Sequence, residues 1–169
     1  LPDTECEESL VNSWCDFALI NEPIDHERFA SVPLFRDCMF AWVPVENDLS
    51  SRTSLTCADL SGQHLTELSL DYVQSKNTER LLRKRAHGYD ILHVNEMIQI
   101  LGHAIRDKRI GLTVRLHAET VNDERVRAIP LVHDTWAFSL CWSAGRFLSK
   151  ADMALIDWFR GSPVSNVSH

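Results

Sequence analysis

Several features that mark common protein classes are missing from this 169-residue sequence. No apolar run reaches the roughly 18 to 20 residues needed to cross a bilayer, and no basic-then-apolar leader precedes the first motif. The five cysteines are an odd number and form no Cys-x-x-Cys pair, which favours reduced, mostly buried thiols. The sequence therefore predicts a cytoplasmic protein that does not associate with a membrane.

Positive charge and chemical motifs are also scarce. The 17 Lys and Arg residues are outnumbered by 24 Asp and Glu residues, and the net charge of −7 argues against this chain gripping nucleic acid phosphates by itself. No Gly-x-Ser-x-Gly motif and no glycine-rich phosphate loop occurs, so we expect no enzyme activity. The eight histidines include no close ligand pair, so we expect neither a metal nor another cofactor.

What the sequence does contain is enough apolar material for a core, since 44% of its residues are hydrophobic. Short apolar runs predict strands in the first third, at residues 16–20 and 34–45. Strands and helices are then expected to alternate, at 64–70, 75–88, 89–94, 95–108 and 110–116. Such alternation predicts a largely parallel sheet with helices on its faces.

The two helices of this middle part carry start and stop signals. Ser75 or Thr78 is expected to begin the first helix, and Gly88 to end it. The second helix is expected to begin at Asn95, and its apolar residues recur at helical spacing. The residues of that apolar face are Met97, Ile100, Leu101, Ala104 and Ile105.

The last third predicts two extended stretches, at 125–134 and 136–144, and then a helix. Ser149 and Asp152 have the spacing of a capping box at its start, and Gly161 is expected to end it. The segments SVPLFRDCMFAWVPV and AIPLVHDTWAFSLCW share one pattern, an apolar residue before Pro-Leu, a polar break and a hydrophobic strand. This similarity predicts two lobes built on one plan.

In their order, these motifs resemble the effector-binding domain of LysR-type transcriptional regulators. Each motif alone is weakly specific, but together they span nearly the whole chain. The matching segments are residues 11–23, 32–50, 55–65, 95–116, 128–142 and 147–159. The chain departs from the family at Asp107-Lys108-Arg109-Ile110, where a Gly-x-Gly-Ile turn is usual, so we expect a different or longer turn there.

The resemblance implies an α/β fold of two Rossmann-like lobes joined by two crossing strands, similar to type II periplasmic binding proteins. It divides the chain into lobe I, residues 1–46 plus 136–169, and lobe II, residues 47–135. One continuous sheet through both lobes would contradict this division. The first strand and helix of the family's lobe I are expected to be missing, as is the N-terminal DNA-binding domain.

By the same resemblance, the chain is expected to be the regulatory domain of a bacterial LysR-type transcription factor. It would bind a small anionic metabolite between its lobes and form a homodimer or higher homo-oligomer, contacting DNA only through a separate domain. The alternatives are a transporter's solute-binding protein and, more remotely, an enzyme on a two-lobed scaffold. The residues upstream of Leu1 would discriminate between a regulator and a transport protein.

Candidate ligand-binding residues follow from where open α/β sheets bind ligands, at the carboxyl ends of strands and the amino ends of helices. For Asn95 and Glu96 the alternative is a purely structural role, as a helix cap and as a charge that complements the helix dipole. For Asn21 the alternative is a solvated strand end. The candidates are Asn21, Glu67, Ser69, His93, Asn95 and Glu96.

Overall fold

The computed structural model describes residues 3–161 and 165–166. Its helices are α1 (Asp3–Val11), α2 (Val73–Arg85), α3 (Met97–Arg106), α4 (Arg115–Thr120) and α5 (Lys150–Gly161), with 3₁₀ turns η1 (Asp48–Ser51) and η2 (Cys57–Leu60). Its strands are β1 (Ala18–Asn21), β2 (Phe29–Pro44), β3 (His64–Leu68), β4 (Asp90–Val94), β5 (Ile110–Val114), β6 (Val126–Ser143) and β7 (Ser165–Asn166).

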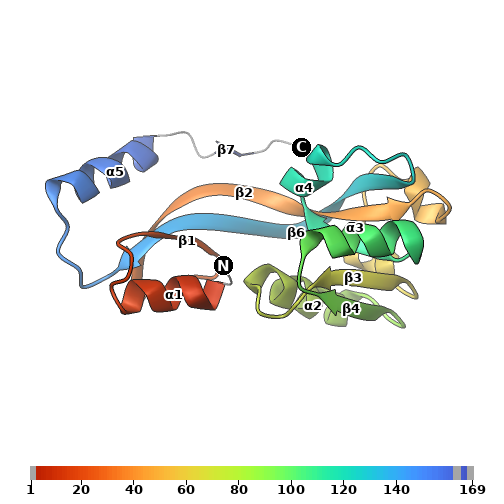
Figure 1. Cartoon of the computed structure of the whole chain (residues 1–169), viewed down its shortest axis with the longest axis horizontal. Helices are drawn as coiled ribbons and strands as arrows, with labels where there is room; N and C mark the ends of the chain where they lie inside the picture. Colours follow the sequence, from red (N-terminus) through yellow and green to blue (C-terminus); the bar gives the residue numbers. More distant parts are fainter. Residues whose placement is uncertain (1–2, 162–164, 167–169) are drawn as a thin grey trace. The chain divides into compact units, whose positions relative to one another are not determined.

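Contacts divide the chain into two compact units (Figure 1). Unit 1 comprises residues 1–37 and 136–169, and unit 2 comprises residues 38–135. The strands are nevertheless hydrogen-bonded in one series, β1-β6-β2-β5-β3-β4, with β7 beside β2. The expectation that no continuous sheet passes through both parts is therefore wrong, because β2 and β6 each contribute residues to both units. The lobe limits expected from the sequence stay a proposal.

Unit 1 is built on the antiparallel pair β1 and β6, with Ala18 opposite Cys141 and Asn21 opposite Phe138. Leu10 of α1 is buried with Ile20, Phe29 and Cys141. The helix α1 is not expected from the sequence, because DTECEESLV is mostly polar and has few apolar residues for a periodic face. Burial raises the pKa of the Cys141 thiol to about 12, which agrees with a buried, unreactive thiol.

The capping box predicted for α5 is confirmed. The backbone N–H of Asp152 donates to Ser149 Oγ at 3.2 Å, and the N–H of Ser149 donates to Asp152 Oδ2 at 2.8 Å. Ile156 is buried, and Phe159 is packed against the same cluster. Trp158 is 65% exposed and is not part of the core.

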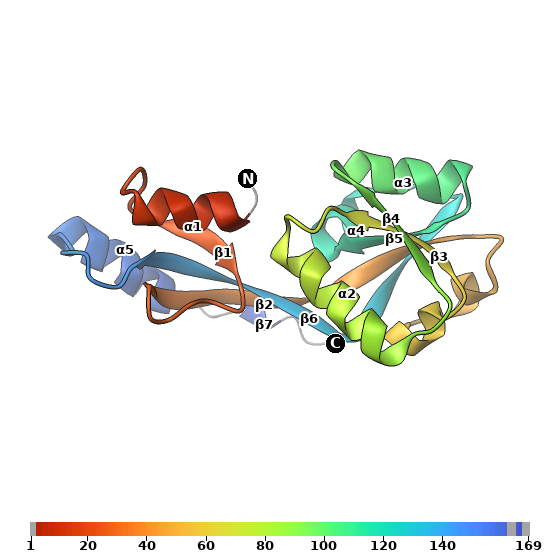
Figure 2. The same cartoon turned by 90° about the horizontal axis from the view of Figure 1, so that it is seen from below.

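Unit 2 holds the expected largely parallel sheet. β3 runs parallel to both β4 and β5, while the end of β2 pairs antiparallel with β5. The helices α2 and α3 lie on opposite faces of this sheet (Figures 1 and 2). The prediction of strands alternating with helices over the middle of the chain is therefore confirmed.

The apolar face predicted for α3 is also confirmed. Ile100 and Ala104 are buried against Trp42 and Leu68, and Met97, Leu101 and Ile105 pack around them. The sheet comes very close to this helix, since a Cβ added to Gly111 would lie 2.6 Å from Ile100 Cγ2.

The predicted helix starts are wrong by two to five residues. The helix α2 begins at Val73, so Ser75 and Thr78 lie inside it and are buried. Glu96, not Asn95, is the residue before the first turn of α3. Both backbone N–H groups, of Asn95 and of Glu96, donate to Gln99 Oε1 at 3.1 Å, so a side chain from the first turn satisfies them. The short helix α4 is not expected, because the sequence favours a strand that continues through its first two residues.

The described residues contain neither a membrane-spanning helix nor a metal-binding cluster. No helix among them is long and apolar enough to span a membrane. No group of three or more His, Cys, Asp or Glu side chains among them is placed to hold a metal ion.

Candidate functional site

The candidate site of unit 2 lies where β3 and β4 end. These strands are parallel and in register, with Glu67 opposite His93 and Leu68 opposite Val94. The backbone N–H of Ser69 donates to Val94 O at 2.8 Å and extends this pairing past the strand ends. The two predicted groups, Glu67 with Ser69 and His93 with Asn95 and Glu96, are therefore brought together at one edge of the sheet.

The outer part of this site is polar and accessible. Asn95 and Glu96 are exposed, and Ser69 is half-buried with its hydroxyl donating to Asp71 Oδ2 at 3.2 Å. Because Glu96 rather than Asn95 precedes the first turn of α3, the purely structural role of Asn95 as a cap is wrong. Its side chain is left available at the surface of the molecule.

The inner part of the site is buried under α2. Leu68 and Val94 belong to the cluster on the α3 face of the sheet. Neighbouring residues of a strand point to opposite faces, so Glu67 and His93 point to the α2 face. Glu67 is 1% exposed there.

Two hydroxyls of α2 are buried at the same interface. Ser75 and Thr78 are 0% and 1% exposed, and they share a helix face with the fully buried Leu82. The helix follows β3 after a short loop and runs back along the sheet, so its first turns lie near the carboxyl ends of β3 and β4 (Figure 2). Ser75 Oγ, Thr78 Oγ1 and His93 Nε2 are buried and have no hydrogen-bond partner among the described residues.

The sequence analysis did not predict that Ser75 and Thr78 are buried between α2 and the sheet. It favours both only as possible starts of the helix. The spacing from Ser75 to Thr78 and on to Leu82 is i, i+3 and i+7, which puts both hydroxyls on the apolar, sheet-facing side. That spacing is the signal in the sequence that could have found them.

Asn21, the remaining candidate, is the last residue of β1 in unit 1. It is 6% exposed, so the alternative of a solvated strand end is wrong for this residue. Glu22 follows it with a backbone N–H bond to Ala137 O at 2.9 Å and an ion pair to Arg36 at 2.9 Å. Its role in ligand binding stays a prediction.

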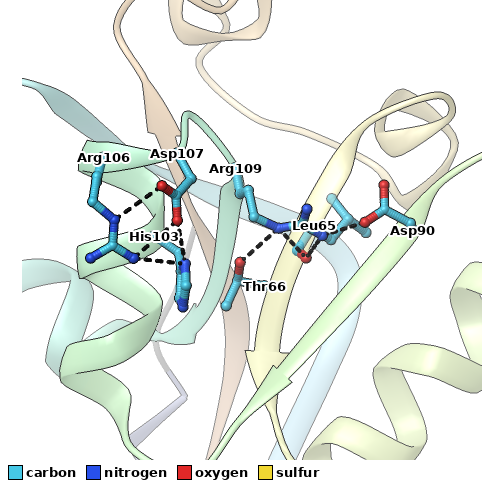
Figure 3. A network of polar contacts seen from close by, with 7 residues as sticks. All are labelled: Leu65, Thr66, Asp90, His103, Arg106, Asp107 and Arg109. Atoms are coloured by element: carbon cyan, nitrogen blue, oxygen red, sulfur yellow. Dashed lines mark hydrogen bonds and ion pairs between the residues drawn. The ribbon is translucent and has the colours of Figure 1, made fainter.

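The opposite, amino end of the same strands carries two polar clusters, and the members of each cluster are bonded to one another (Figure 3). Arg109 Nε donates to Leu65 O at 3.1 Å and Thr66 Oγ1 at 3.2 Å, and Arg109 Nη2 donates to Leu65 O at 2.7 Å and to Asp90. His64 Nδ1 also contacts Asp90. Hydrogen bonds from Arg109 and then from His64 hold the pKa of Asp90 below its usual value.

A second polar group lies at the end of α3 (Figure 3). Asp107 accepts a hydrogen bond from Arg106 Nε at 3.0 Å and is 2.6 Å from His103 Nδ1. The Arg106 hydrogen bond, followed by that of His103, lowers the pKa of Asp107 to about 2. The side chains of these two clusters are thus engaged with partners from the chain itself.

An open α/β sheet with a polar, partly unsatisfied site at its strand ends defines a ligand-binding domain. The family model of the LysR substrate binding domain matches residues 2–163. The chain therefore belongs to this family and is a sensor domain, not an enzyme. This membership decides against a transporter's solute-binding protein.

Solved structures show the same fold. The CcmR regulatory domain of Synechocystis PCC6803 in complex with 2-PG has a TM-score of 0.77 and 10% identity, covering 93% of this chain and 77% of that one. The effector-binding domain of QuiR in complex with shikimate has a TM-score of 0.74 and 15% identity, covering 90% and 73%. The reduced OxyR regulatory domain of Pseudomonas aeruginosa has a TM-score of 0.74 and 12% identity, covering 93% and 78%. No curated protein matches the chain.

Proposed function

We propose that this effector-binding domain recognises a small anionic metabolite at the carboxyl ends of β3 and β4. In the intact regulator, binding would bias the equilibrium between conformations and so control the DNA contacts of a separate domain. The expected contacts are Ser69, Asn95 and Glu96 at the surface and His93 beneath them.

One observation carries this proposal, the buried polar groups under the first turns of α2. A buried hydroxyl or ring nitrogen without a partner costs about 1–3 kcal/mol relative to the hydrogen-bonded state. Ser75, Thr78 and His93 contribute three such atoms close to one edge of the sheet. A molecule that hydrogen-bonds to them recovers this free energy, which favours an occupied state at this place.

The preference for an anion rests on the amino end of α2. The side chain of Tyr72, the residue before its first turn, makes no capping hydrogen bond. The N–H groups and partial positive charge of a helix start favour a carboxylate or phosphate. The binding of 2-PG by CcmR and of shikimate by QuiR supports a small-molecule effector for a domain of this fold.

A thermal-shift screen of small metabolites tests the proposal, because a ligand that binds only the folded state raises its melting temperature. Asn95→Ala is expected to weaken binding of the hit about tenfold, a loss of ~1.4 kcal/mol. It should leave the melting temperature of the free domain unchanged, because Asn95 is exposed and is not the cap.

Ser69→Ala should weaken binding in the same way, and Ser54→Ala is its matched control at an exposed serine outside the site. Equal effector affinity in wild type, Asn95→Ala and Ser69→Ala would contradict the proposal. A hit whose binding is lost equally in the Ser54→Ala control would contradict it too.

A homodimer or higher homo-oligomer is part of the same proposal. Three aromatic side chains of unit 1 support it, because Trp14, Phe147 and Trp158 are 76%, 90% and 65% exposed and exposed aromatic residues are enriched at interfaces. Light scattering after gel filtration should give a molar mass at least twice that of the 19.3 kDa chain. A monomer at every concentration would contradict it.

A further inference from the structure

Unit 2 has an open groove that the proposed effector site does not use. It encloses about 880 Å³ and is lined by the end of β2, the segment around η1 and the start of β6. Trp42 of β2 pairs antiparallel with Gly111, near the start of β5, so the residues that follow Trp42 lie at the amino end of the parallel strands. The groove is therefore at the end of the sheet opposite Ser69 and Asn95.

One wall of the groove is fixed at both ends. At its start, Asn47 Oδ1 accepts from the N–H of Leu49 at 3.0 Å, and its Nδ2 donates to Gln63 Oε1 at 2.8 Å. At its finish, Leu55 forms a bridge with Leu131 of β6 through backbone hydrogen bonds of 2.8 and 2.9 Å. The intervening residues, including Arg52 and Thr53, are thus held in place before any ligand arrives, which lowers the entropic cost of binding.

Two arginines line this groove, Arg52 on the η1 side and Arg127 on β6. Both are exposed, and in the part of the chain that the structure describes neither has a carboxylate within ion-pair distance. This contrasts with their neighbour Arg125, whose Nε and Nη2 contact the two oxygens of Asp123 at 2.9 and 2.7 Å.

Three acids on or beside the segments that line the groove are engaged with other groups of the chain. The hydrogen bond from Arg125 lowers the pKa of Asp123 to about 2, so this carboxylate is committed to its own arginine. Glu46 forms an ion pair with Lys108 at 2.7 Å. Asp59 accepts hydrogen bonds from both the N–H and the hydroxyl of Thr56 at 2.7 Å. The Thr56 hydrogen bonds and, more weakly, the charge of Arg52 lower the pKa of Asp59, so Arg52 is partly compensated, although neither groove arginine forms an ion pair in the described part of the chain.

The rest of the lining is mixed, with apolar residues beside polar ones: Val45, Val121, Val126, Ala128 and Ile129, and Ser50, Ser51, Thr53, Asn122 and Asp123. Val45 is 40% exposed, while Val126 and Ile129 are buried at 8% and 3%. The serine hydroxyls here donate to main-chain oxygens, Ser50 to Val45 O and Ser51 to Asp48 O, each at 3.0 Å. A ligand would thus meet two guanidinium groups and a short valine and isoleucine wall.

We propose that this groove is a second ligand site of the domain, which takes a small organic carboxylate with an apolar body. Guanidinium forks bind carboxylates through charge-assisted hydrogen bonds. The valine and isoleucine side chains remove the body of the ligand from water. The site is independent of the effector site proposed at the other end of the sheet.

Hexanoate is a suitable probe. Two control compounds each keep one of its features: 1-hexanol keeps the apolar body, and inorganic phosphate keeps the negative charge. Titration of the ¹⁵N-labelled chain is expected to give saturable shifts of the backbone amides of Val45, Arg52 and Arg127. The hexanol and phosphate affinities should each be weaker by about tenfold or more, because each lacks one of the two interactions.

The double variant Arg52→Gln/Arg127→Gln should abolish saturable hexanoate binding. Its matched control is Arg80→Gln/Arg85→Gln, which removes the same charge from exposed positions of α2. The control should bind hexanoate as the wild type does, and so should Ser69→Ala/Asn95→Ala, which changes the effector site.

Three results would overturn the proposal. In the first, hexanoate shifts no amide of the groove. In the second, both arginine double variants lose affinity equally, which would mean that net charge alone attracts the probe. In the third, the largest shifts occur at Ser69 and Asn95 and disappear in the Ser69→Ala/Asn95→Ala variant.

Discussion

The two ends of the parallel strands in unit 2 are both polar, yet they differ in whether their polar groups have partners. At the amino end, Arg109 bonds to Leu65, Thr66 and Asp90. At the carboxyl end, Ser75 and Thr78 are buried without a hydrogen-bond partner among the described residues. Hydrogen bonds made within the chain stabilise the fold, whereas buried groups without them destabilise it until something binds.

This difference separates structural polar residues from candidate ligand contacts better than residue type does. Both ends contain histidine, aspartate or glutamate, and hydroxyl side chains. What distinguishes them is that Ser75 Oγ, Thr78 Oγ1 and His93 Nε2 are buried without a hydrogen-bond partner among the described residues. The same criterion separates Arg52 and Arg127 from Arg125, which lies beside them.

The largest effect is expected from breaking the amino end. Arg109→Gln removes a guanidinium that is 17% exposed and holds a main-chain oxygen, a hydroxyl and a carboxylate. We expect the free energy of unfolding to fall by about 2 kcal/mol, as for a lost charge-assisted hydrogen bond. Urea denaturation measures this.

Arg106→Gln is the matched control, since that side chain is 68% exposed and bonds only at the surface. It should change the free energy of unfolding by no more than about 0.5 kcal/mol. Equal losses of unfolding free energy in the two variants would show that the hydrogen bonds of Arg109 do not stabilise these strands more than a surface contact does.

Substitutions at the carboxyl end should instead raise the free energy of unfolding. Ser75→Ala with Thr78→Val replaces two buried hydroxyls by apolar groups of similar shape, which is expected to raise the free energy of unfolding by about 1 kcal/mol. The same variant should bind the effector more weakly. Denaturation and binding titrations of one preparation check both.

A loss of stability in that variant would mean that the hydroxyls are already satisfied in the free domain, for example by ordered water. Unchanged effector affinity would remove Ser75 and Thr78 from the site. The exposed Ser54→Ala, with no comparable burial, should alter neither quantity.

Much of unit 2 could be predicted from the sequence, because its strands and helices have strong periodic signals. The apolar face from Met97 to Ile105 is an example, since its spacing alone predicts the helix α3 and the side that it buries. The site could be predicted only as a region. Register along parallel strands brings Glu67 beside His93, but whether Ser75 finds a hydrogen-bond partner depends on tertiary packing, which no local pattern encodes.

Unit 1 was less predictable. The helix α1 has an acidic, weakly periodic sequence, and it is held by Leu10 packing against Ile20 and Phe29, which are distant in the chain. The two extended stretches expected on either side of Thr135 are one strand, β6. Their similar patterns suggested separate units, while backbone hydrogen bonding continues through both.

A smaller effect on stability is expected at Lys108, in the turn before β5. Lys108 has φ of +57°, in the left-handed region that costs a non-glycine residue about 1 kcal/mol. Lys108→Gly relieves this strain but loses an exposed ion pair with Glu46, which is worth about 0–1 kcal/mol. We expect a net gain of about 0.5 kcal/mol in the free energy of unfolding.

Glu46→Gln isolates the ion pair, since it leaves the backbone of Lys108 as it is. In a chain that already carries Lys108→Gly, Glu46→Gln should not lower the free energy of unfolding any further. A Lys108→Gly variant less stable than Glu46→Gln would show that the turn is not strained.

The smallest effect concerns protonation of the amino-end carboxylate. Because Arg106 and then His103 hydrogen-bond to Asp107, its pKa is lowered from 3.8 to about 2 in the folded chain. A carboxyl group whose pKa is lower in the folded state stabilises that state above its ordinary pKa, and this contribution is lost as the pH falls from about 4 through about 2. Since Asp107 is exposed, we expect only a slight decline in stability over that range.

The carboxyl ¹³C signal of Asp107 should titrate near pH 2, and in Arg106→Gln its midpoint should move up toward 3.8. A wild-type midpoint near 4 would mean that the Asp107 carboxylate is solvated. The hydrogen-bonded residues at the amino end would then include Arg109 and Asp90 but not Asp107.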